Sequence, residues 1–387
     1  MSVPMYEIAV IGGGGMIGAA AARHLVEAGR RIVVVAAPEP DDWSSGPGPF
    51  ASHYDAARIT RVMAADPVWA ELASRSIARY ADLERRSGMT FHRPCGLAWI
   101  GPDLEEVITN ATDRSAEARR VSRDWLYAVT GIRVPDIGSP EAAFEAGPAG
   151  TVDPRALPRA ELVVARNGGA EIVPHAAHSL RREGSGFVVA GSFGEVRAAR
   201  VLLATGSYGA GLAGVELALV RNPRTVLRVD LGPATELPAL IIDTDIHEDV
   251  TGVYWTPPSR YPDGRTLFKI GGSLVGATPV ESPTEIDAWF ATDGNEREAA
   301  ALLHNVRELL PGARLFGWDT KPCVTTDTTT GYPYLGFVDD GIAVALGGNG
   351  ASAKSCDEIG RLASRLFADA AWTDDVLTAE TFTPQFA

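Results

Sequence analysis

Apolar positions in the N-terminal stretch predict a strand, a helix and a second strand. The positions Ile8–Ile11 are all apolar, as expected of a strand buried on both faces of a parallel sheet. Gly29 then ends a predicted helix whose apolar stripe consists of Ile17, Ala21, Leu25 and Ala28. Because a second apolar run begins at Ile32, the pattern is typical of the first strand–helix–strand unit of an α/β domain.

A run of glycines joins the first predicted strand to the helix. Gly13, Gly15 and Gly18 give the best match to G-x-G-x-x-G. In this motif the first glycine allows a tight turn, the second lets a pyrophosphate approach the backbone, and the third lets the helix pack closely on the strand. A register that begins at Gly12 stays open and would place Ile17 at the third glycine. The motif predicts a dinucleotide at the helix N-terminus, and the alternative is a glycine-rich turn of another α/β fold.

The end of the second predicted strand departs from the usual dinucleotide pattern. An acidic residue normally stands there and binds a ribose hydroxyl. Here Val35 is followed by Ala36, and the first acid, Glu39, comes a few residues late. Two interpretations stay open: Glu39 reaches back to the ribose, or other bonds hold the nucleotide.

The middle of the chain alternates between helical periodicity and short apolar runs. A turn of helix near residue 60 would put Arg58 and Arg61 on one face. The predicted segments that follow are a helix that Asp66 caps and Pro67 begins, a strand over Phe91–Ile100, a helix over Leu104–Val129, a turn over Gly150–Asp153 and a helix from Asp153 to Gly168.

Short apolar runs dominate the second half. Strands at Ala170–Val173 and Val201–Ala204 enclose a hairpin over Gly186–Arg200 and resume the nucleotide-binding layout. The segments predicted after them are strands at Val226–Leu231, Leu240–Asp243, Gly252–Trp255 and Thr266–Ile270, a helix over Ile286–Leu310, a strand at Ile342–Leu346 and a final helix after the glycine-rich stretch 347–354.

Together these segments predict an α/β fold with α+β insertions. A Rossmann-like nucleotide domain is expected to comprise residues 1–90, 150–210 and 320–387. A second domain, built on a mainly antiparallel sheet, is expected to comprise residues 91–149 and 211–319. Because the chain passes repeatedly between the two domains, no single linker separates them.

Composition excludes several classes of protein. The 387 residues carry a net charge of −14 without a basic block, which argues against nucleic acid and anionic membranes as partners. No run of about 18 uncharged apolar residues and no signal-peptide pattern is present, so neither a membrane span nor export is predicted. Cys95, Cys323 and Cys356 are odd in number and far apart, which favours a reducing, cytoplasmic location. The seven histidines show no metal-ligand spacing, so no metal site is predicted.

Four blocks of sequence, in order, match a known family. They are Ser52-His53 with Arg58-Ile-Thr-Arg61, Lys269 after a predicted strand, Cys323, and Gly-Gly-Asn-Gly-Ala-Ser-Ala-Lys at 347–354. On these blocks the whole chain resembles the flavin-dependent amine oxidases of the D-amino-acid oxidase superfamily, above all the monomeric sarcosine oxidase and N-methyltryptophan oxidase group. The resemblance implies bound FAD, with its adenine half on the first domain and the substrate between the flavin and the antiparallel sheet.

The resemblance also implies a reaction. A hydride equivalent leaves a C–N bond of a small-molecule amine or amino acid, which yields an imine, and oxygen takes up the electrons as hydrogen peroxide. A monomeric enzyme is expected. Two other interpretations stay open: a dehydrogenase that uses another electron acceptor, and a flavin-binding protein without turnover.

Residues at the cofactor can be assigned from the same resemblance. Cys323 matches a cysteine that forms a thioether to the flavin ring, and the nearby Lys321 would favour its thiolate; the alternative is a small buried hydrophobic side chain. Arg58 matches an arginine beside the flavin, where its charge stabilises the reduced ring. Further cofactor contacts are expected from Gly13, Gly15, Gly18, Glu39, Ser52, Val173, Ala204, Gly206, Gly348, Gly350 and Lys354.

Three cations are assigned to the reaction itself. Arg61 and Lys354 match positions that clasp the substrate carboxylate, to which the planar fork of arginine and the point charge of lysine are suited; the alternative is two solvated surface charges. Lys269 matches a lysine above the flavin that stabilises developing superoxide; the alternative is a lysine that guards an edge strand.

Other positions depart from the sarcosine oxidase pattern. Tyr54 replaces a histidine, Trp255 stands where a tyrosine is common, and Ser273 replaces a histidine of the amine pocket. The flavin residues are thus retained while the pocket changes, which favours a larger or cyclic secondary amino acid over sarcosine. Tyr54 and Trp255 are expected to form an aromatic wall for it.

Overall fold

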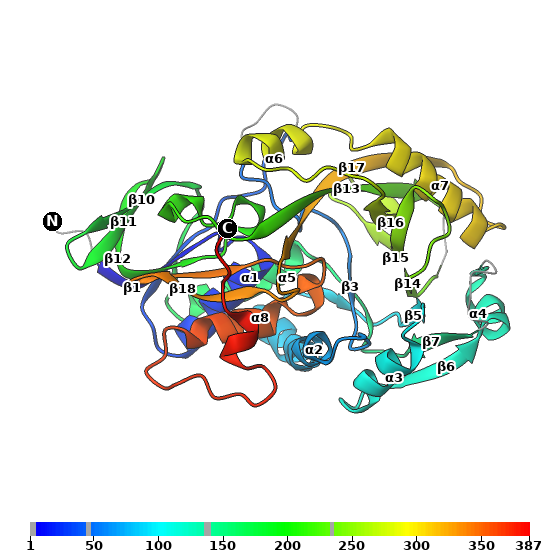
Figure 1. The fold of residues 1–387 in the computed structure, drawn as a ribbon, viewed down its shortest axis with the longest axis horizontal. Coiled ribbons are helices and arrows are strands. Elements are labelled where there is room, and N and C mark those ends of the chain that lie inside the picture. Colours follow the sequence, from blue (N-terminus) through cyan, green and yellow to red (C-terminus); the bar gives the residue numbers. More distant parts are fainter. Residues whose placement is uncertain (1–4, 44–47, 135–140, 233–235) are drawn as a thin grey trace.

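The computed structural model describes residues 5–43, 48–134, 141–232 and 236–387. Within these residues the strands form three sheets. Figure 1 shows one sheet around β1 and β12, a second around β13 to β16, and a third, small one that includes β3. The predicted α/β class, with a second and mainly antiparallel sheet, is confirmed.

The first sheet carries the glycine-rich turn. Its strand order is β10–β11–β12–β1–β2–β9, with β19 beside β12 and β18 beside β19. The central strand β1 lies parallel to β2 and β12, and its neighbour β2 is wholly buried, which explains the uninterrupted apolar runs. The strands are β1 (Met5–Ile11), β2 (Ile32–Val35), β9 (Glu171–Val173), β10 (Ala177–Glu183), β11 (Gly186–Gly191), β12 (Gly194–Leu203), β18 (Tyr334–Asp339) and β19 (Ile342–Leu346).

Four helices pack together beside this sheet (Figure 1). They are α1 (Met16–Glu27), α2 (Pro67–Ser87), α5 (Ala156–Asn167) and α8 (Cys356–Arg365). As predicted, Asp66 caps α2 by accepting hydrogen bonds from the backbone N–H groups of Val68 and Trp69. The helices α1 and α8 approach closely at Gly360, where an added Cβ would lie 2.5 Å from the Cβ of Ala20.

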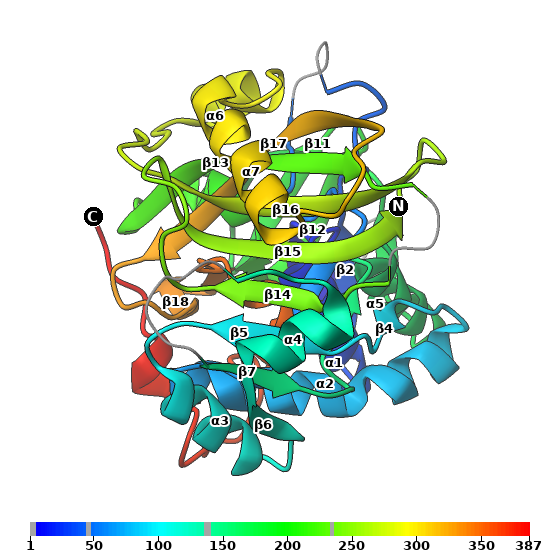
Figure 2. The same cartoon turned by 90° about the vertical axis from the view of Figure 1, so that its right-hand side faces the viewer.

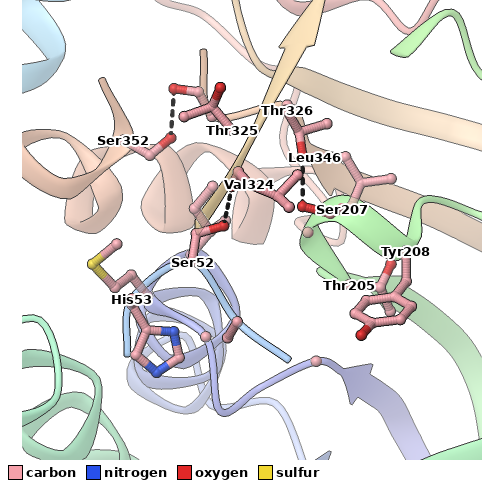
Figure 3. A pocket seen from close by; sticks show the side chains of 18 of the residues that line it. Ser52, His53, Thr205, Ser207, Tyr208, Val324, Thr325, Thr326, Leu346 and Ser352 are labelled. Carbon is pink, nitrogen blue, oxygen red and sulfur yellow. Dashed lines mark hydrogen bonds between the residues drawn. The ribbon is translucent and has the colours of Figure 1, made fainter. Parts of the chain in front are cut away.

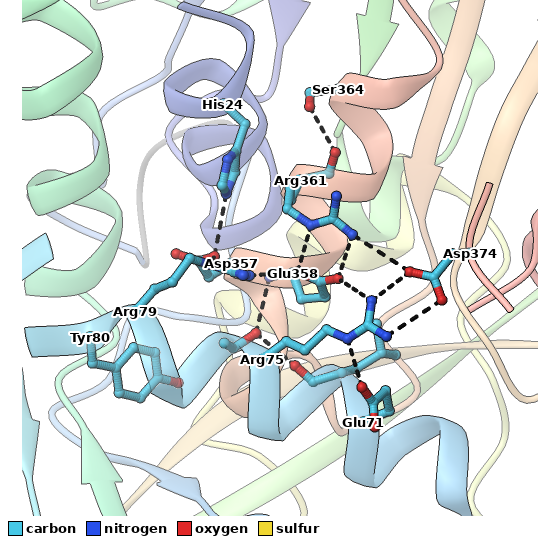
Figure 4. A network of polar contacts seen from close by, with 12 residues as sticks. His24, Glu71, Arg75, Arg79, Tyr80, Asp357, Glu358, Arg361, Ser364 and Asp374 are labelled. Carbon is cyan, nitrogen blue, oxygen red and sulfur yellow. Dashed lines mark hydrogen bonds and ion pairs between the residues drawn. The ribbon is translucent and has the colours of Figure 1, made fainter. Parts of the chain in front are cut away.

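Buried charges join these four helices. The Arg23 guanidinium, 4% exposed, donates to Glu161 of α5 and, at 2.5 Å, to Asp357 of α8. Arg79 of α2 binds Asp357 and Glu358 (Figure 4). Burial alone would raise the pKa of Asp357, but a hydrogen bond from His24 and the charges of Arg23 and Arg79 hold it below its usual range. Because Arg23 bridges two fully buried carboxylates, removing it would leave Glu161 without its arginine and Asp357 with only one of its two.

The second sheet has the order β17–β13–β16–β15–β14–β5–β7–β6. Its neighbouring strands are antiparallel except for β14 and β5. The helix α7 (Glu296–Leu309) lies across this sheet (Figure 2). The strands are β5 (Leu97–Ile100), β6 (Ala118–Ser122), β7 (Glu141–Glu145), β13 (Leu219–Asp230), β14 (Ala239–Ile242), β15 (Val250–Arg260), β16 (Thr266–Leu274) and β17 (Gly317–Thr328).

Shorter elements complete the described chain. A small sheet contains β3 (Arg58–Thr60), β8 (Gly150–Val152) and β4 (His92–Arg93). The remaining helices are α3 (Leu104–Thr112), α4 (Arg123–Thr130) and α6 (Pro283–Phe290), with 3-10 turns at Gly206–Tyr208, Gly211–Ala213, Ser352–Lys354 and Ala379–Phe382. No helix in the described ranges combines the length and hydropathy needed to cross a membrane.

The helical turn considered for Arg58 and Arg61 does not form, and the turn predicted over Gly150–Asp153 was wrong. Both segments are strands, and they pair with each other in the small sheet, with Arg58 opposite Val152. Their hydrogen-bond partners lie almost a hundred residues away, so local periodicity could not reveal them.

Three predicted elements were too long. The strand predicted over Phe91–Ile100 is divided between β4 and β5, with Gly96 at φ 74° between them. The helix predicted over Leu104–Val129 is interrupted by β6, which pairs with β7. The helix predicted over Ile286–Leu310 is interrupted where Asn295 caps α7. The final helix begins at Cys356, directly after the glycine-rich stretch 347–354, as predicted.

The division of the chain into domains stays a prediction. The predicted boundary near residue 320 falls inside β17, which belongs to the second sheet. The strands β18 and β19 that follow it belong to the first sheet. The chain therefore passes between the two sheets after β17 rather than before it.

We expect Arg23→Met to lower the stability of the protein by about 3–5 kcal/mol, because Glu161 stays buried without its arginine and Asp357 loses one of its two. Urea unfolding of the purified protein, followed by circular dichroism, measures this loss. The control is Arg86→Met: Arg86 is 33% exposed and pairs with Glu27 at 2.6 Å, so its loss should cost no more than about 1 kcal/mol. Equal losses in both variants would contradict the prediction.

Candidate active site

A cavity of about 1200 Å³ is lined by residues of both large sheets. Figure 3 shows part of its wall, in which Ser52 faces Val324 of the strand segment Val324–Thr326. Ser52 donates a hydrogen bond to the carbonyl of Val324 at 2.5 Å. Ser207 and Thr326 are hydrogen-bonded at 2.9 Å. These two hydrogen bonds connect segments that follow β2 and β12 of the first sheet to strand β17 of the second sheet.

The glycine-rich turn forms one end of the cavity. Gly12, at φ 83°, Gly14 and Gly15 line it. A Cβ at Gly18 would lie 2.5 Å from the carbonyl oxygen of Gly12, so Gly18 occupies the close-packed third position of the motif and Ile17 does not. Gly15 precedes helix α1 without a side-chain cap, which leaves the helix N-terminus open to a ligand.

Glu39, the first acidic residue after β2, pairs with an arginine of the protein and not with the space above the glycine-rich turn. Both carboxylate oxygens of Glu39 accept hydrogen bonds of 2.6 Å from Arg155, and Glu39 lies outside the cavity lining. Val173 also lies outside it, with its carbonyl bonded to the N–H of Ala36 at 2.9 Å. Of the two interpretations left open by the sequence, this geometry favours a ribose held by other bonds.

Several of the other expected cofactor residues lie around the same space, but Gly13 and Gly18 are not part of the cavity lining. Ala204, Gly206, Gly348 and Gly350 all line the cavity. The hydroxyl of Thr325, which also lines it, is buried without a hydrogen-bond partner among the described residues. A glycine cradle at an open helix end, together with an unpaired buried hydroxyl, fits a bound dinucleotide.

Cys323 and Arg58 meet at the middle of the cavity. The Cys323 sulfur is 3.7 Å from the Arg58 guanidinium, and both side chains line the cavity. Arg58 also donates to the carbonyl of Ser52. Arg58 is thus a cation in contact with the sulfur. The Lys321 ammonium lies 5.3 Å from the Trp43 ring centre.

Asp55, which the sequence analysis did not single out, connects this centre to Lys269. Its carboxylate accepts hydrogen bonds from Lys269 at 2.6 Å and from Tyr261 at 2.9 Å, and lies 3.0 Å from Arg58. Although burial alone would raise it, Lys269 and Arg58 hold the pKa of Asp55 below its usual range. An aspartate two residues after His53 carries no local signal for this role.

Lys269 is fully buried and lies behind the cavity wall rather than in it. Its ammonium also donates to the carbonyl of Ala57 and lies 5.7 Å from the ring centre of Tyr254, which does line the cavity. Burial lowers the pKa of Lys269 to about 8, although Asp55 opposes the shift. The charge on this lysine therefore responds to pH near neutrality.

Arg61 and Lys354 are brought together in the cavity wall, as expected. Lys354 is 4% exposed and donates to the carbonyl of Trp69 at 2.9 Å. Burial and the charge of Arg61 lower the pKa of Lys354 well below its usual value. Burial lowers the pKa of Arg61 to about 10, and its Nε has no hydrogen-bond partner among the described residues. An anion bound here would relieve the repulsion between the two cations.

The expected aromatic wall is only partly correct. Tyr54 and Ser273 line the cavity, but Trp255 does not. Trp255 is fully buried in the core of the second sheet, with its indole N–H bonded to the carbonyl of Pro238 at 2.9 Å. Successive side chains of a strand point to opposite faces, so its neighbour Tyr254 faces the cavity instead.

This fold and site are those of flavin-dependent oxidoreductases. The chain belongs to the family described as FAD dependent oxidoreductase (DAO), whose model matches residues 7–366. The predicted family and the FAD cofactor are confirmed. A search of curated proteins gave no significant match.

Solved structures agree with this fold over nearly the whole chain. NikD, an unusual amino acid oxidase essential for nikkomycin biosynthesis, has a TM-score of 0.77 and 20% identity over 99% of this chain and 98% of that one. Glycine oxidase from Geobacillus kaustophilus has a TM-score of 0.71 and 20% identity, covering 96% and 97% of the two chains. L-proline dehydrogenase from P. horikoshii has a TM-score of 0.77 and 15% identity, covering 98% of each. At these identities the likeness concerns the fold.

Proposed function

We propose that this protein oxidises the C–N bond of an amino acid with a primary or secondary amine to an imine and passes the electrons to oxygen, which yields hydrogen peroxide. The observation that carries the proposal is the pair of cations in the cavity wall, half-buried Arg61 and buried Lys354. The bound FAD supplies the two-electron acceptor. The names of NikD and glycine oxidase, which are amino acid oxidases, support the same substrate class.

The two cations would bind the substrate through its carboxylate. Arg61 has an unpartnered Nε, and Lys354 already orients its ammonium through Trp69. A carboxylate held by both leaves the α-carbon and its amine little freedom to rotate away from the redox ring. The same positive charge disfavours a protonated amine nearby. The substrate amine can therefore lose its proton without a dedicated base.

The rest of the pocket favours a substrate larger than sarcosine. Ser273 is a small residue in the cavity wall, and Gly272 beside it also lines the cavity. Tyr54 and Tyr254 contribute aromatic surface. Such a lining suits a bulkier or cyclic secondary amino acid.

An anaerobic screen tests the reaction. Holoenzyme is mixed without oxygen with panels of α-amino acids, N-methyl amino acids and cyclic imino acids, and loss of the flavin absorbance identifies substrates. Admitting oxygen should restore the absorbance and release one hydrogen peroxide per flavin. Recovery only with an artificial acceptor would identify a dehydrogenase, as the name of L-proline dehydrogenase suggests for that relative. A flavin that no amine reduces would refute the proposal.

We expect Arg61→Met to weaken binding of the substrate carboxylate by roughly ten- to hundredfold, because charge-assisted hydrogen bonds contribute about 1.5–3 kcal/mol. Anaerobic titration of the flavin spectrum with substrate measures the dissociation constant. Arg119→Met is the matched control, because Arg119 also lies over an indole, 4.5 Å from Trp125, but outside the cavity. Undiminished affinity in Arg61→Met would place the carboxylate elsewhere.

We also propose a thioether between the Cys323 sulfur and a methyl carbon of the flavin ring. Forming it removes one proton from the thiol and one from the methyl group, and oxygen takes up the two electrons. Acid precipitation of the wild type should therefore leave yellow fluorescence in the pellet, and Cys323→Ser should release it to the supernatant. Cys95→Ser, which changes a cysteine outside the cavity, should retain it. Flavin that stays with Cys323→Ser would refute the bond.

We expect Lys269→Met to slow flavin reoxidation by oxygen more than tenfold, because a buried positive charge favours electron transfer to oxygen. Flavin reduction in the same variant serves as the internal control. Since the pKa of Lys269 is lowered to about 8, the ammonium form is lost as pH rises through that value, and the wild-type reoxidation rate should fall with it. Stopped-flow absorbance follows both half-reactions. Equal slowing of both would argue against a role in oxygen chemistry.

A further inference from the structure

The carboxylate of Asp55 lies at the centre of a buried cluster of hydrogen-bond donors. Its Oδ2 atom accepts a hydrogen bond from the Lys269 ammonium at 2.6 Å and lies 3.0 Å from the Arg58 guanidinium. Its Oδ1 atom accepts from the Tyr261 hydroxyl at 2.9 Å and from the backbone N–H of Ala56 at 2.8 Å. Both cations therefore share one oxygen of a side chain that is only 5% exposed.

Neither cation has a second carboxylate. Within the described ranges, Asp55 is the only acidic side chain that forms an ion pair with Lys269 or with Arg58. The Lys269 ammonium also donates to the carbonyl of Ala57, which is neutral, and the lysine side chain is fully buried. Because burial penalises a charge that has no partner, the ammonium depends on Asp55, and Arg58 competes for the same carboxylate.

The remaining titratable groups near Lys269 come from the strands and the turn around it. They are Arg228 of β13, Tyr254 of β15, Tyr261 in the turn between β15 and β16, and Asp319 and Cys323 of β17. Burial raises the pKa of Tyr254 to about 12 and that of Tyr261 well above its usual value, so both phenols stay neutral near neutral pH. Cys323 carries no charge once it forms the proposed thioether.

Two further cations near this cluster are already paired. Arg228 donates to both carboxylate oxygens of Asp319, at 2.6 and 2.8 Å. Arg155, which donates to the backbone carbonyl of Asp55, is paired with Glu39 at 2.6 Å. Neither of them needs the shared carboxylate, which is left to the lysine and the arginine that contact it.

Resting on the proposed function, we propose that Asp55 is a positioning residue for the oxygen half-reaction. Its carboxylate holds the Lys269 ammonium behind the cavity wall and keeps it charged to a higher pH than burial alone would allow. Arg58 binds the same carboxylate and limits this effect. Asp55 lies outside the cavity lining, so it acts through Lys269 and not on the reacting atoms.

The direction of each effect follows from the sign of the charges. Burial lowers the pKa of Lys269, Asp55 raises it, and Arg58 lowers it further. Asp55 itself stays ionised: burial alone would raise its pKa, but Lys269 and Arg58 hold it below its usual range. A lysine is charged below its pKa and neutral above it. Removing Asp55 therefore moves the loss of the ammonium to lower pH, and removing Arg58 moves it to higher pH.

Reoxidation of the reduced holoenzyme tests the inference. The flavin is reduced photochemically without an amine substrate, which makes the test independent of substrate binding. Stopped-flow absorbance then follows reoxidation by oxygen from acidic to alkaline pH. In Asp55→Asn the pH midpoint of the reoxidation rate should lie at least about one pH unit below that of the wild type, and acid should restore the rate. A merely structural defect would lower the rate by the same factor at every pH.

Two further variants separate the effect of charge from other effects. Arg58→Met leaves the whole carboxylate to Lys269, so its midpoint should move above that of the wild type, whatever happens to the absolute rate. Tyr261→Phe is the matched control, because it removes a hydrogen bond to the same carboxylate without changing any charge. Its midpoint should stay at the wild-type value. If Asp55→Asn does not fold, the upward shift in Arg58→Met still tests the inference.

The outcomes separate this inference from the proposed function. A midpoint that stays or rises in Asp55→Asn, or that stays or falls in Arg58→Met, would overturn the inference, as would an equal shift in Tyr261→Phe. If Lys269→Met still slows reoxidation in that case, the role of the lysine stands and only the part given to Asp55 fails. If oxygen reoxidises Lys269→Met as fast as the wild type, or does not reoxidise the wild type, the oxygen step of the proposed function fails and the inference fails with it.

Discussion

Positive charge buried where the two large sheets meet is the constraint on which the rest of this structure depends. Arg58 and Lys269 share a single carboxylate, that of Asp55. Arg61 and Lys354 have only partial compensation, and the pKa of each is lowered. Burying charge is expensive unless it is paired. The fold holds one pair of cations in a network, and the other pair suits the carboxylate of the proposed substrate.

The fold places these charges by bringing distant segments together. The segment from Ser52 to Arg61 crosses from the glycine-rich turn to the small sheet, and Ser52 is bonded to Val324 of β17. Lys354 reaches the same cavity from the turn that precedes α8. The ionic network of Arg23, Asp357 and Arg79 holds α1, α2 and α8 together beneath that turn. Stability and the placement of the site therefore rest on the same helices.

The proposed function gives the pair of cations in the cavity wall a purpose. On that proposal, Arg61 and Lys354 would bind the carboxylate that every amino acid has and so would fix the position of the reacting bond. The Trp99 ring, whose centre lies 5.0 Å from the Arg61 guanidinium, belongs to the same wall.

The sequence by itself determined the nucleotide cradle, the buried runs of the first sheet, the Asp66 cap of α2 and the blocks that identify the family, because these depend on local spacing and backbone sterics. Only the tertiary structure decided that Arg58 lies in a strand opposite Val152, that Glu39 pairs with Arg155 and that Asp55 joins Lys269. It also decided that Tyr254 and not Trp255 faces the cavity. Successive side chains of a strand point to opposite faces of the sheet. A register shift of one residue would therefore move a side chain from the core to the cavity. Which face is which depends on partners far away in the chain.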